Sequence, residues 1–299
     1  TMSAKQRRDN SKPDSKKPYS RKMENKKREN QKPYGKKPYI KMPDVRKQID
    51  EDLIWGRQPV LDLLQYSPQK CLKVWISERA HPSFSGEVMT LARSAKVPFQ
   101  KVASTLVDEM CPGENHQGAV AKITMVEQLD MEDFLPTLKT KEGPILLVVL
   151  DHILDPHNLG AIIRTAEAAG ATAVVYSKRR SALPGGTVVK VSAGAALRVP
   201  MISVTNIAQT ITRLQEEGFW VVGLDHNAPQ SLWGATYPDK SSIVVGAEGE
   251  GLSRLVAQRC DMLLRIPITG KTGSLNAGVA AALGMFEWAR AKGVDVHGE

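Results

Sequence analysis

The sequence is poor in cysteine and lacks any long apolar run. It contains 3 cysteines in 299 residues, Cys71, Cys111 and Cys260, and none of them forms a C-x-x-C pair. This usage is typical of a reduced cytoplasmic protein without a disulfide framework or a cysteine-based metal site. No stretch of about 18 apolar residues predicts a membrane-spanning helix, and no apolar segment near residue 1 predicts a signal peptide. We therefore expect a cytoplasmic protein.

Motifs of several common enzyme classes are also missing. Neither a P-loop nor a G-x-S-x-G nucleophile motif occurs in the sequence. The 6 histidines are scattered without H-x-x-x-H spacing, so we predict no metal site. His157 lies in a polar segment, but without an identifiable partner it does not indicate a catalytic base.

Positive charge is concentrated at the start of the chain. Residues 1–50 hold 17 Lys and Arg against 6 Asp and Glu, a net charge of +11, whereas the whole chain carries +9. The remaining residues therefore sum to −2. A segment rich in Lys, Asn, Pro and Ser buries too little apolar surface to offset the entropy lost on ordering. We predict that residues 1–50 form a disordered basic tail.

A Lys-Pro-Tyr unit recurs in this tail, at residues 17–19, 32–34 and 37–39. Lysine pairs with phosphate, proline favours an extended backbone, and tyrosine stacks on bases. The pattern favours contact with RNA, although a purely solubilising tail would carry the same charge.

Two α/β regions follow the tail. Residues 51–126 alternate short strands and helices and predict a small α/β domain, and residues 127–143 fit a short helix and a linker. Residues 144–293 alternate strands and helices regularly, which predicts a parallel sheet covered by helices on both faces. Within this region the periodicity predicts helices over residues 159–169, 188–196 and 274–291.

Three polar segments lie where a predicted strand ends and a helix begins. The first is Asp-Pro-His-Asn-Leu-Gly at residues 155–160, followed by Arg164. The second is Gly-Ala-Glu-Gly-Glu-Gly-Leu at residues 246–252. The third joins Ile-Pro-Ile at residues 266–268 to Gly-Ser-Leu-Asn at residues 273–276. Open α/β sheets bind ligands at the carboxyl ends of their strands, so three such segments indicate an enzyme site.

The second segment has G-x-x-G-x-G spacing, which differs from the G-x-G-x-x-G dinucleotide fingerprint. Glu248 and Glu250 would repel a pyrophosphate held in this loop. A phosphate-free, cationic ligand such as S-adenosylmethionine fits better, because glycines let the backbone approach a ligand closely. A glycine-rich turn with solvated carboxylates is the alternative for this segment taken alone.

The other two segments also have purely structural interpretations. Asn158, Ser274 and Asn276 are ordinary capping residues at predicted helix starts. Arg164 is either a surface charge or an anchor for phosphate or ribose, since a guanidinium offers five donors and a permanent charge. The apolar residues of the third segment are either core or the walls of an adenine slot.

Together and in this order, the three segments resemble the signature motifs of the SpoU/TrmH family, the SPOUT-class RNA 2′-O-ribose methyltransferases. The first carries Asp-Pro ahead of Asn158 and Arg164, the second reads G-A-E-G-x-G-L, and the third has I-P followed by S-L-N. The resemblance covers residues 53–292 and is strongest to the branch that methylates a guanosine ribose in large-subunit ribosomal RNA.

The resemblance implies an α/β fold: a knotted SPOUT domain of the trefoil-knot type, an exception to the general absence of knots. A ribosomal-protein-like substrate-binding domain would precede it, with a turn at residues 116–118. It also implies S-adenosylmethionine as cofactor, RNA as substrate and a homodimer. The implied catalytic residues are Asn158, Arg164, Glu248, Ser274 and Asn276. The implied cofactor-binding residues are Leu224, Gly246, Ala247, Glu248, Gly249, Ile266, Ile268, Leu275 and Asn276.

Gly278 departs from the family pattern, in which a serine often occupies this position. In the implied reaction a ribose 2′-oxygen attacks the sulfonium methyl group in line, and alignment supplies most of the acceleration. Arg164 would hold a phosphate and stabilise the developing alkoxide, because a guanidinium is a poor proton acceptor near neutrality. Glu248 and Asn276 would orient Arg164 or the ribose.

Three alternatives stay open. The transfer RNA branch of the family shares all three motifs. A non-catalytic RNA chaperone or ribosome-assembly factor with the same fold would bind RNA without methyl transfer. A nucleotide-dependent dehydrogenase is disfavoured by the carboxylates Glu248 and Glu250.

Overall fold

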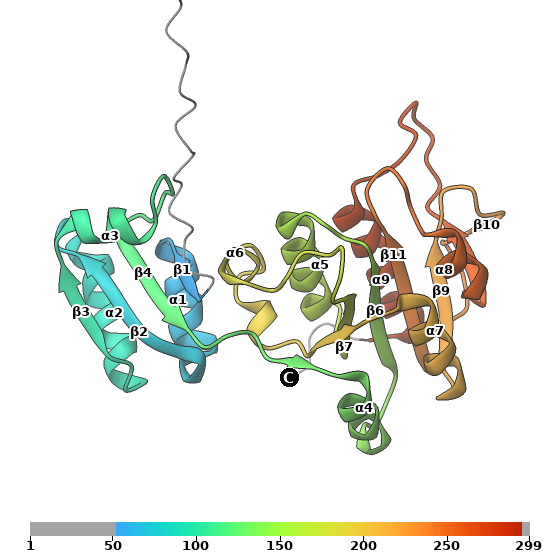
Figure 1. Ribbon diagram of the computed structural model, residues 1–299, viewed down its shortest axis with the longest axis horizontal. Helices are drawn as coiled ribbons and strands as arrows, with labels where there is room; N and C mark the ends of the chain where they lie inside the picture. The colour runs from blue at the N-terminus through green and yellow to red at the C-terminus, as the bar shows by residue number, and fades with distance from the viewer. Residues whose placement is uncertain (1–51, 295–299) are drawn as a thin grey trace, which may run out of the picture. The chain divides into compact units, whose positions relative to one another are not determined.

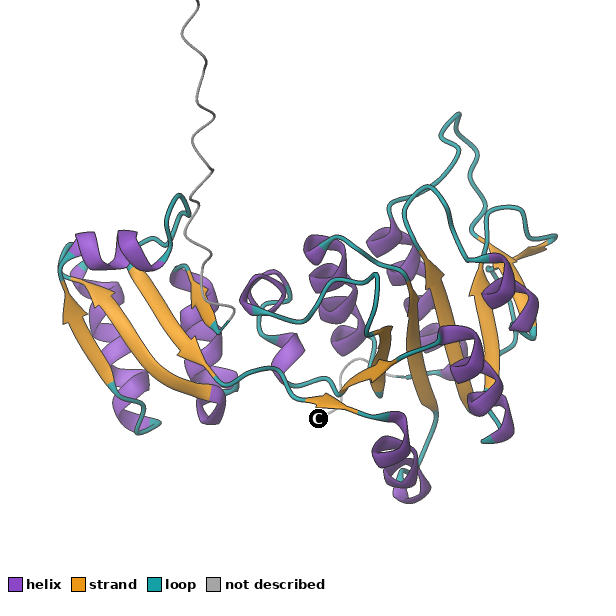
Figure 2. Cartoon of the chain, viewed as in Figure 1, coloured by secondary structure: helices purple, strands orange, loops and turns teal. Residues whose placement is uncertain are grey.

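The computed structural model describes residues 52–294, which form two sheets with their covering helices (Figures 1 and 2). The tail predicted to be disordered, residues 1–50, lies outside the described residues. Within residues 52–294, no helix combines the length and the apolar character needed to cross a lipid bilayer.

The first sheet has 4 strands in the order β1-β4-β2-β3, and β3 runs parallel to β2 while β4 is antiparallel to both of its neighbours. Its strands are β1 (Leu53–Trp55), β2 (Cys71–Ser77), β3 (Phe99–Val102) and β4 (Ala119–Ile123). The helices of this region are α1 (Arg57–Tyr66), α2 (Pro82–Ser94) and α3 (Ser104–Met110), with a short 3-10 turn η1 (Pro68–Lys70).

Side chains alternate between the two faces of this sheet, as a strand requires. Ile54 packs in the larger core, whereas its neighbour Trp55 packs in a smaller cluster with Val107 of α3. The turn predicted before β4 is present, with Gln117 at φ 50° and Gly118 at φ 80°. The alternation explains why both faces of so small a sheet are covered by helices.

The second sheet has 8 strands in the order β10-β12-β9-β11-β6-β7-β8-β5, and every pairing in it is parallel. Its strands are β5 (Gln128–Leu129), β6 (Ile145–Asp151), β7 (Ala173–Ser177), β8 (Met201–Val204), β9 (Trp220–Leu224), β10 (Gln230–Ser231), β11 (Lys240–Gly246) and β12 (Met262–Arg265). The predicted parallel sheet is confirmed.

Helices cover both faces of this sheet, as its apolar strands predict. All seven residues of β6 are buried; Leu146 and Val148 face different core clusters from their neighbours Leu147 and Val149. The helices are α4 (Met131–Phe134), α5 (Pro156–Ala168), α6 (Gly186–Val191), α7 (Ile207–Glu216), α8 (Arg254–Arg259) and α9 (Ala277–Lys292), with 3-10 turns η2 (Leu135–Thr140) and η3 (Ala195–Leu197).

Two predictions about local structure need correction. The segment predicted as a short helix and linker, residues 127–143, also supplies β5, which extends the large sheet beside β8. The helix predicted over residues 188–196 is wrong in its centre, where Ala193 (φ 51°) and Gly194 (φ 79°) form a left-handed turn between α6 and η3. Periodicity missed this turn because the flanking residues are buried on a helical spacing.

Candidate active site

The first polar loop places Asn158 inside helix α5. The helix is capped by Asp155, whose carboxylate accepts a hydrogen bond of 3.0 Å from the backbone nitrogen of His157. Asn158 is therefore not the cap, and its side chain reaches a different loop. Its Nδ2 atom donates to Glu248 Oε2 at 3.2 Å. The capping interpretation of Asn158 is thus wrong, because an aspartate three residues earlier already fills that role.

Asn276 connects the third loop to the other two. Its Nδ2 atom donates to Asn158 Oδ1 at 2.9 Å and to Glu248 Oε1 at 2.6 Å. Its Oδ1 atom accepts from the backbone nitrogens of Gly278 and Val279 at 2.9 and 3.3 Å and so caps α9. Asn276 has both roles at once: it begins the last helix and closes a three-residue network. We call Asn158, Glu248 and Asn276 the amide–carboxylate network.

The glycines of the second loop are required by close backbone packing. A Cβ atom on Gly246 would lie 2.1 Å from the carbonyl carbon of Gly251, so no other residue fits there. Gly251 donates its backbone N–H to the carbonyl of Ala247 at 2.9 Å, which closes the loop on itself. The buried carboxylate of Asp151 accepts a 2.7 Å hydrogen bond from the backbone nitrogen of Ser253 and anchors the end of the loop. These contacts hold Glu248 within a short, closed loop.

A cleft opens at the carboxyl ends of β9, β11 and β12. Its apolar walls include Leu264 and Ile266, its polar groups include Asp225 and Glu248, and no Lys or Arg is among its lining residues. The cleft therefore offers apolar walls and acidic groups, which suit a ligand with an aromatic base and a positive charge.

Most predicted site residues gather at this cleft. Its lining includes the following predicted residues: Leu224, Gly246, Ala247, Glu248, Gly249, Ile266, Ile268, Ser274 and Leu275. Asn276 belongs to the amide–carboxylate network instead. The cleft is also lined by Val245 and Gly251 at the second segment, and by residues that sequence reasoning did not single out: Asp225, His226, Leu264, Ala277 and Ala280. Asp225 and His226 directly follow β9, so the rule about strand ends could have found them.

Arg164 lies apart from the network. It is exposed on α5, and within residues 52–294 its side chain makes no hydrogen bond or ion pair. Both carboxylate oxygens of Glu248 bond to Asn158 and Asn276, so the predicted orientation of Arg164 by Glu248 is not seen. The guanidinium is thereby left available for a ligand.

Comparisons with known proteins match both α/β regions. Residues 145–286 match the SpoU rRNA Methylase family, and residues 53–129 match the RNA 2′-O ribose methyltransferase substrate binding family. The 23S rRNA (guanosine-2′-O-)-methyltransferase RlmB of Vibrio parahaemolyticus is 37% identical over 242 residues, which cover 81% of this chain and 98% of that protein. The chain belongs to the SpoU family of RNA methylases. It is a SAM-dependent RNA 2′-O-ribose methyltransferase, as the resemblance implied.

Further relatives support this assignment. RlmB of Pseudomonas putida is 38% identical over 245 residues, covering 81% of this chain and 97% of that protein. YacO of Bacillus subtilis, named as a TrmH family tRNA/rRNA methyltransferase, is 37% identical over 236 residues, covering 79% of this chain and 94% of that protein. Among solved structures, the SpoU methyltransferase AviRb from Streptomyces viridochromogenes with AdoMet superimposes with a TM-score of 0.65 at 23% identity, covering 80% and 89% of the two chains. This likeness confirms the predicted SPOUT fold.

The cleft of this SpoU-family protein fits S-adenosylmethionine. Ile266 and Leu264 provide apolar surface for an adenine, and the closed loop at Gly246 brings backbone groups to the cleft wall. Asp225 and Glu248 provide negative charge for a cationic ligand, whereas a phosphate would find no Lys or Arg on the lining. The donor set therefore matches the predicted cofactor in both its apolar and its charged parts.

Proposed function

We propose that this SpoU-family enzyme methylates the ribose 2′-hydroxyl of a guanosine in large-subunit ribosomal RNA. The support is the pair of RlmB relatives, whose names state this reaction and which align with nearly their whole length. The described substrate-binding region matches a family named for RNA 2′-O ribose methyltransferases, which supports an RNA substrate.

The proposal is tested by mapping ribose methylation across total RNA from a strain that lacks this gene. The expected result is the loss of one guanosine 2′-O-methyl group in large-subunit ribosomal RNA and its return on complementation. Loss of a methyl group from transfer RNA would favour the transfer RNA branch of the family, an alternative that the name of YacO, a tRNA/rRNA methyltransferase, leaves open. RNA binding by the purified protein without transfer of labelled methyl would favour a non-catalytic assembly factor.

For the site itself we propose a division of labour. Bound S-adenosylmethionine supplies the activated methyl group. The neutral amides of Asn158 and Asn276 donate hydrogen bonds to both oxygens of the Glu248 carboxylate. We assign to Glu248, Ser274 and Asn276 the alignment of the ribose, and to Arg164 the binding of an RNA phosphate and the stabilisation of charge developing on the 2′-oxygen. The cleft residues named above would bind the cofactor.

We further propose the division of the chain into a substrate-binding domain at residues 51–126, a connecting segment at 127–143 and a methyltransferase domain at 144–293.

We also propose that the protein forms a homodimer. Val279 and Phe286 are exposed by 48% and 43% and lie seven residues apart on α9, on one face of the helix. Sedimentation analysis of the purified chain tests the dimer. Free thiols at all three described cysteines support action in the reducing cytoplasm.

A further inference from the structure

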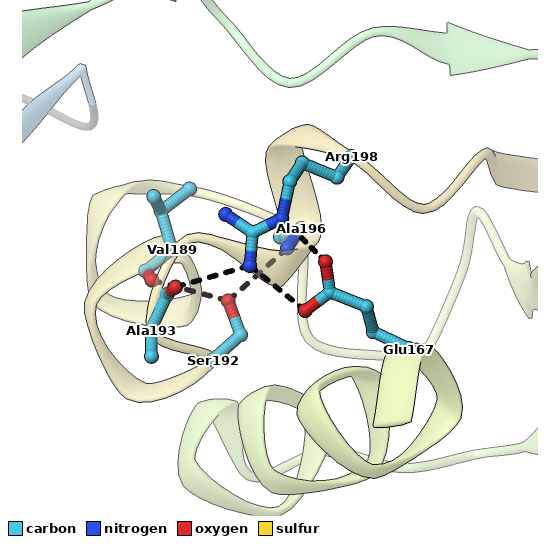
Figure 3. Close-up of polar contacts among 6 residues, drawn as sticks. All are labelled: Glu167, Val189, Ser192, Ala193, Ala196 and Arg198. Carbon is cyan, nitrogen blue, oxygen red and sulfur yellow. Dashed lines mark hydrogen bonds and ion pairs between the residues drawn. The ribbon is translucent and has the colours of Figure 1, made fainter. Parts of the chain in front are cut away.

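Helix α5 carries a carboxylate that is held by an arginine from outside the helix (Figure 3). Arg198, which follows η3, donates from Nε to Glu167 Oε1 and from Nη2 to Glu167 Oε2, the second bond at 2.8 Å. Both oxygens of Glu167 are therefore occupied by one guanidinium. Such two-point pairing between a planar guanidinium and a carboxylate is the strongest side-chain geometry for this pair of charges.

The turn between α6 and η3 is shaped around this guanidinium. Ala193 (φ 51°) and Gly194 (φ 79°) adopt left-handed conformations, and Ala193 accepts a 3.4 Å hydrogen bond from Arg198 Nη2. A Cβ atom on Gly194 would lie 3.0 Å from Arg198 Nη1. Ser192 stabilises the turn, since its Oγ donates to the backbone carbonyl of Val189 and accepts from the backbone nitrogen of Ala196 (Figure 3). The hydrogen bond to Glu167 raises the pKa of Arg198 further above its usual value, so this arginine stays charged.

Arg164 and Glu167 are three residues apart on α5. Side chains at this spacing are neighbours on a helix surface, and opposite charges there form ion pairs. Gly160 marks the side of α5 that faces α6, because a Cβ on it would lie 2.7 Å from Val191. Gly160, Arg164 and Glu167 follow the i, i+4, i+7 pattern of a single helix face. Yet Arg164 has no partner among the described residues, while Glu167 is bound to Arg198.

We propose that Arg198 is a positioning residue that keeps the Glu167 carboxylate from pairing with Arg164, so that Arg164 stays free for an RNA phosphate. The inference rests on the role proposed above for Arg164. A guanidinium already paired within its own helix would have to give up that partner before it could bind RNA. Removing Arg198 would leave the partly buried Glu167 carboxylate without its partner, one helical turn from Arg164. The carboxylate would then pair with Arg164 and neutralise the positive charge that binds RNA.

The test compares four full-length enzymes, namely the wild type, Arg198→Met, Glu167→Gln and the double variant. Arg198→Met is expected to lower kcat/KM for RNA by about fivefold. This loss lies between the effect of an exposed ion pair on a helix and that of a buried ion pair. Its affinity for S-adenosylmethionine, measured by calorimetry, stays within about twofold of the wild type, because neither Arg198 nor Glu167 lines the cleft. Adding Glu167→Gln to Arg198→Met is expected to restore activity, since a neutral amide does not cancel the charge of Arg164.

The double variant separates this idea from a merely structural role. If the pair only fastened α5 to the turn, the double variant would be no more active than Arg198→Met, and that result overturns the inference. Arg198→Lys, which restores the charge without the planar fork, is expected to recover part of the activity. Arg164→Ala in the wild-type background is the control for the underlying role. If Arg164→Ala retains full activity, the proposed role of Arg164 fails; if it is inactive and Arg198→Met is normal, the inference about Arg198 alone fails.

Discussion

Two carboxylates lie near helix α5, one close to its start and one close to its end, and they are held in opposite ways. Glu248 contacts Asn158 and Asn276, whose neutral amides satisfy its oxygens without cancelling its charge. Glu167 is held by the cation Arg198, which cancels its charge. Glu248 borders the cleft for a cationic cofactor, whereas Glu167 neighbours the exposed Arg164. The difference shows that the hydrogen-bond partners of a carboxylate decide whether it acts as a negative charge or only as a structural contact.

The largest effect is expected at the arginine between the two carboxylates. Arg164→Lys keeps the positive charge but loses the planar set of donors, so turnover should fall by about 100-fold, the scale of losing one donor to a developing oxyanion. Affinity for S-adenosylmethionine should change by less than about twofold, because Arg164 does not line the cleft. Methyl transfer from labelled cofactor to RNA measures the first value and calorimetry the second. Near-normal turnover would remove Arg164 from the mechanism.

An intermediate effect is expected at Glu248, and the same change at Glu167 serves as its control. Glu248→Gln replaces one acceptor oxygen by an NH2 group that faces an amide donor, and it removes the negative charge beside the cleft. We expect kcat/KM for S-adenosylmethionine to fall by about tenfold, the cost of one unsatisfied charged hydrogen bond. Glu167→Gln is the matched control and should stay within about twofold of the wild type. Equal losses in the two variants would contradict the comparison.

The smallest effect is expected in the turn that receives Arg198. Gly194→Ala places a Cβ 3.0 Å from Arg198 Nη1 at a residue with φ of 79°, so the free energy of unfolding should fall by about 1 kcal/mol. Methyl transfer should fall by no more than about twofold, since the pair with Glu167 is shifted rather than lost. Urea unfolding measures the first quantity. Gly86→Ala on α2, where an added Cβ meets no atom within 4 Å, is the control and should not destabilise the protein.

Sequence reasoning located the three loops because each combines a buried strand with a polar helix start, and both patterns are local. It could not choose between capping and site roles for Asn158 and Asn276, because both roles select the same amide side chain. The structure separates them: Asp155 caps α5, so Asn158 is free, while Asn276 caps α9 with one atom and joins the network with another. The serine usual at position 278 would be tight here, since a Cβ on Gly278 would lie 3.1 Å from Asn276 Oδ1.

From its amino acids alone the chain could be recognised as an α/β protein with a parallel sheet and as a relative of SpoU methylases. Alternating hydrophobicity and short motifs depend only on residues that are close together in the sequence. Which partners those residues meet was decided only by the tertiary structure. Asn158 and Asn276 are separated by 118 positions along the chain, and Glu167 and Arg198 by 31. Contacts of this kind depend on the order of strands in the sheet and on the left-handed turn at Ala193 and Gly194, which brings Arg198 back to α5.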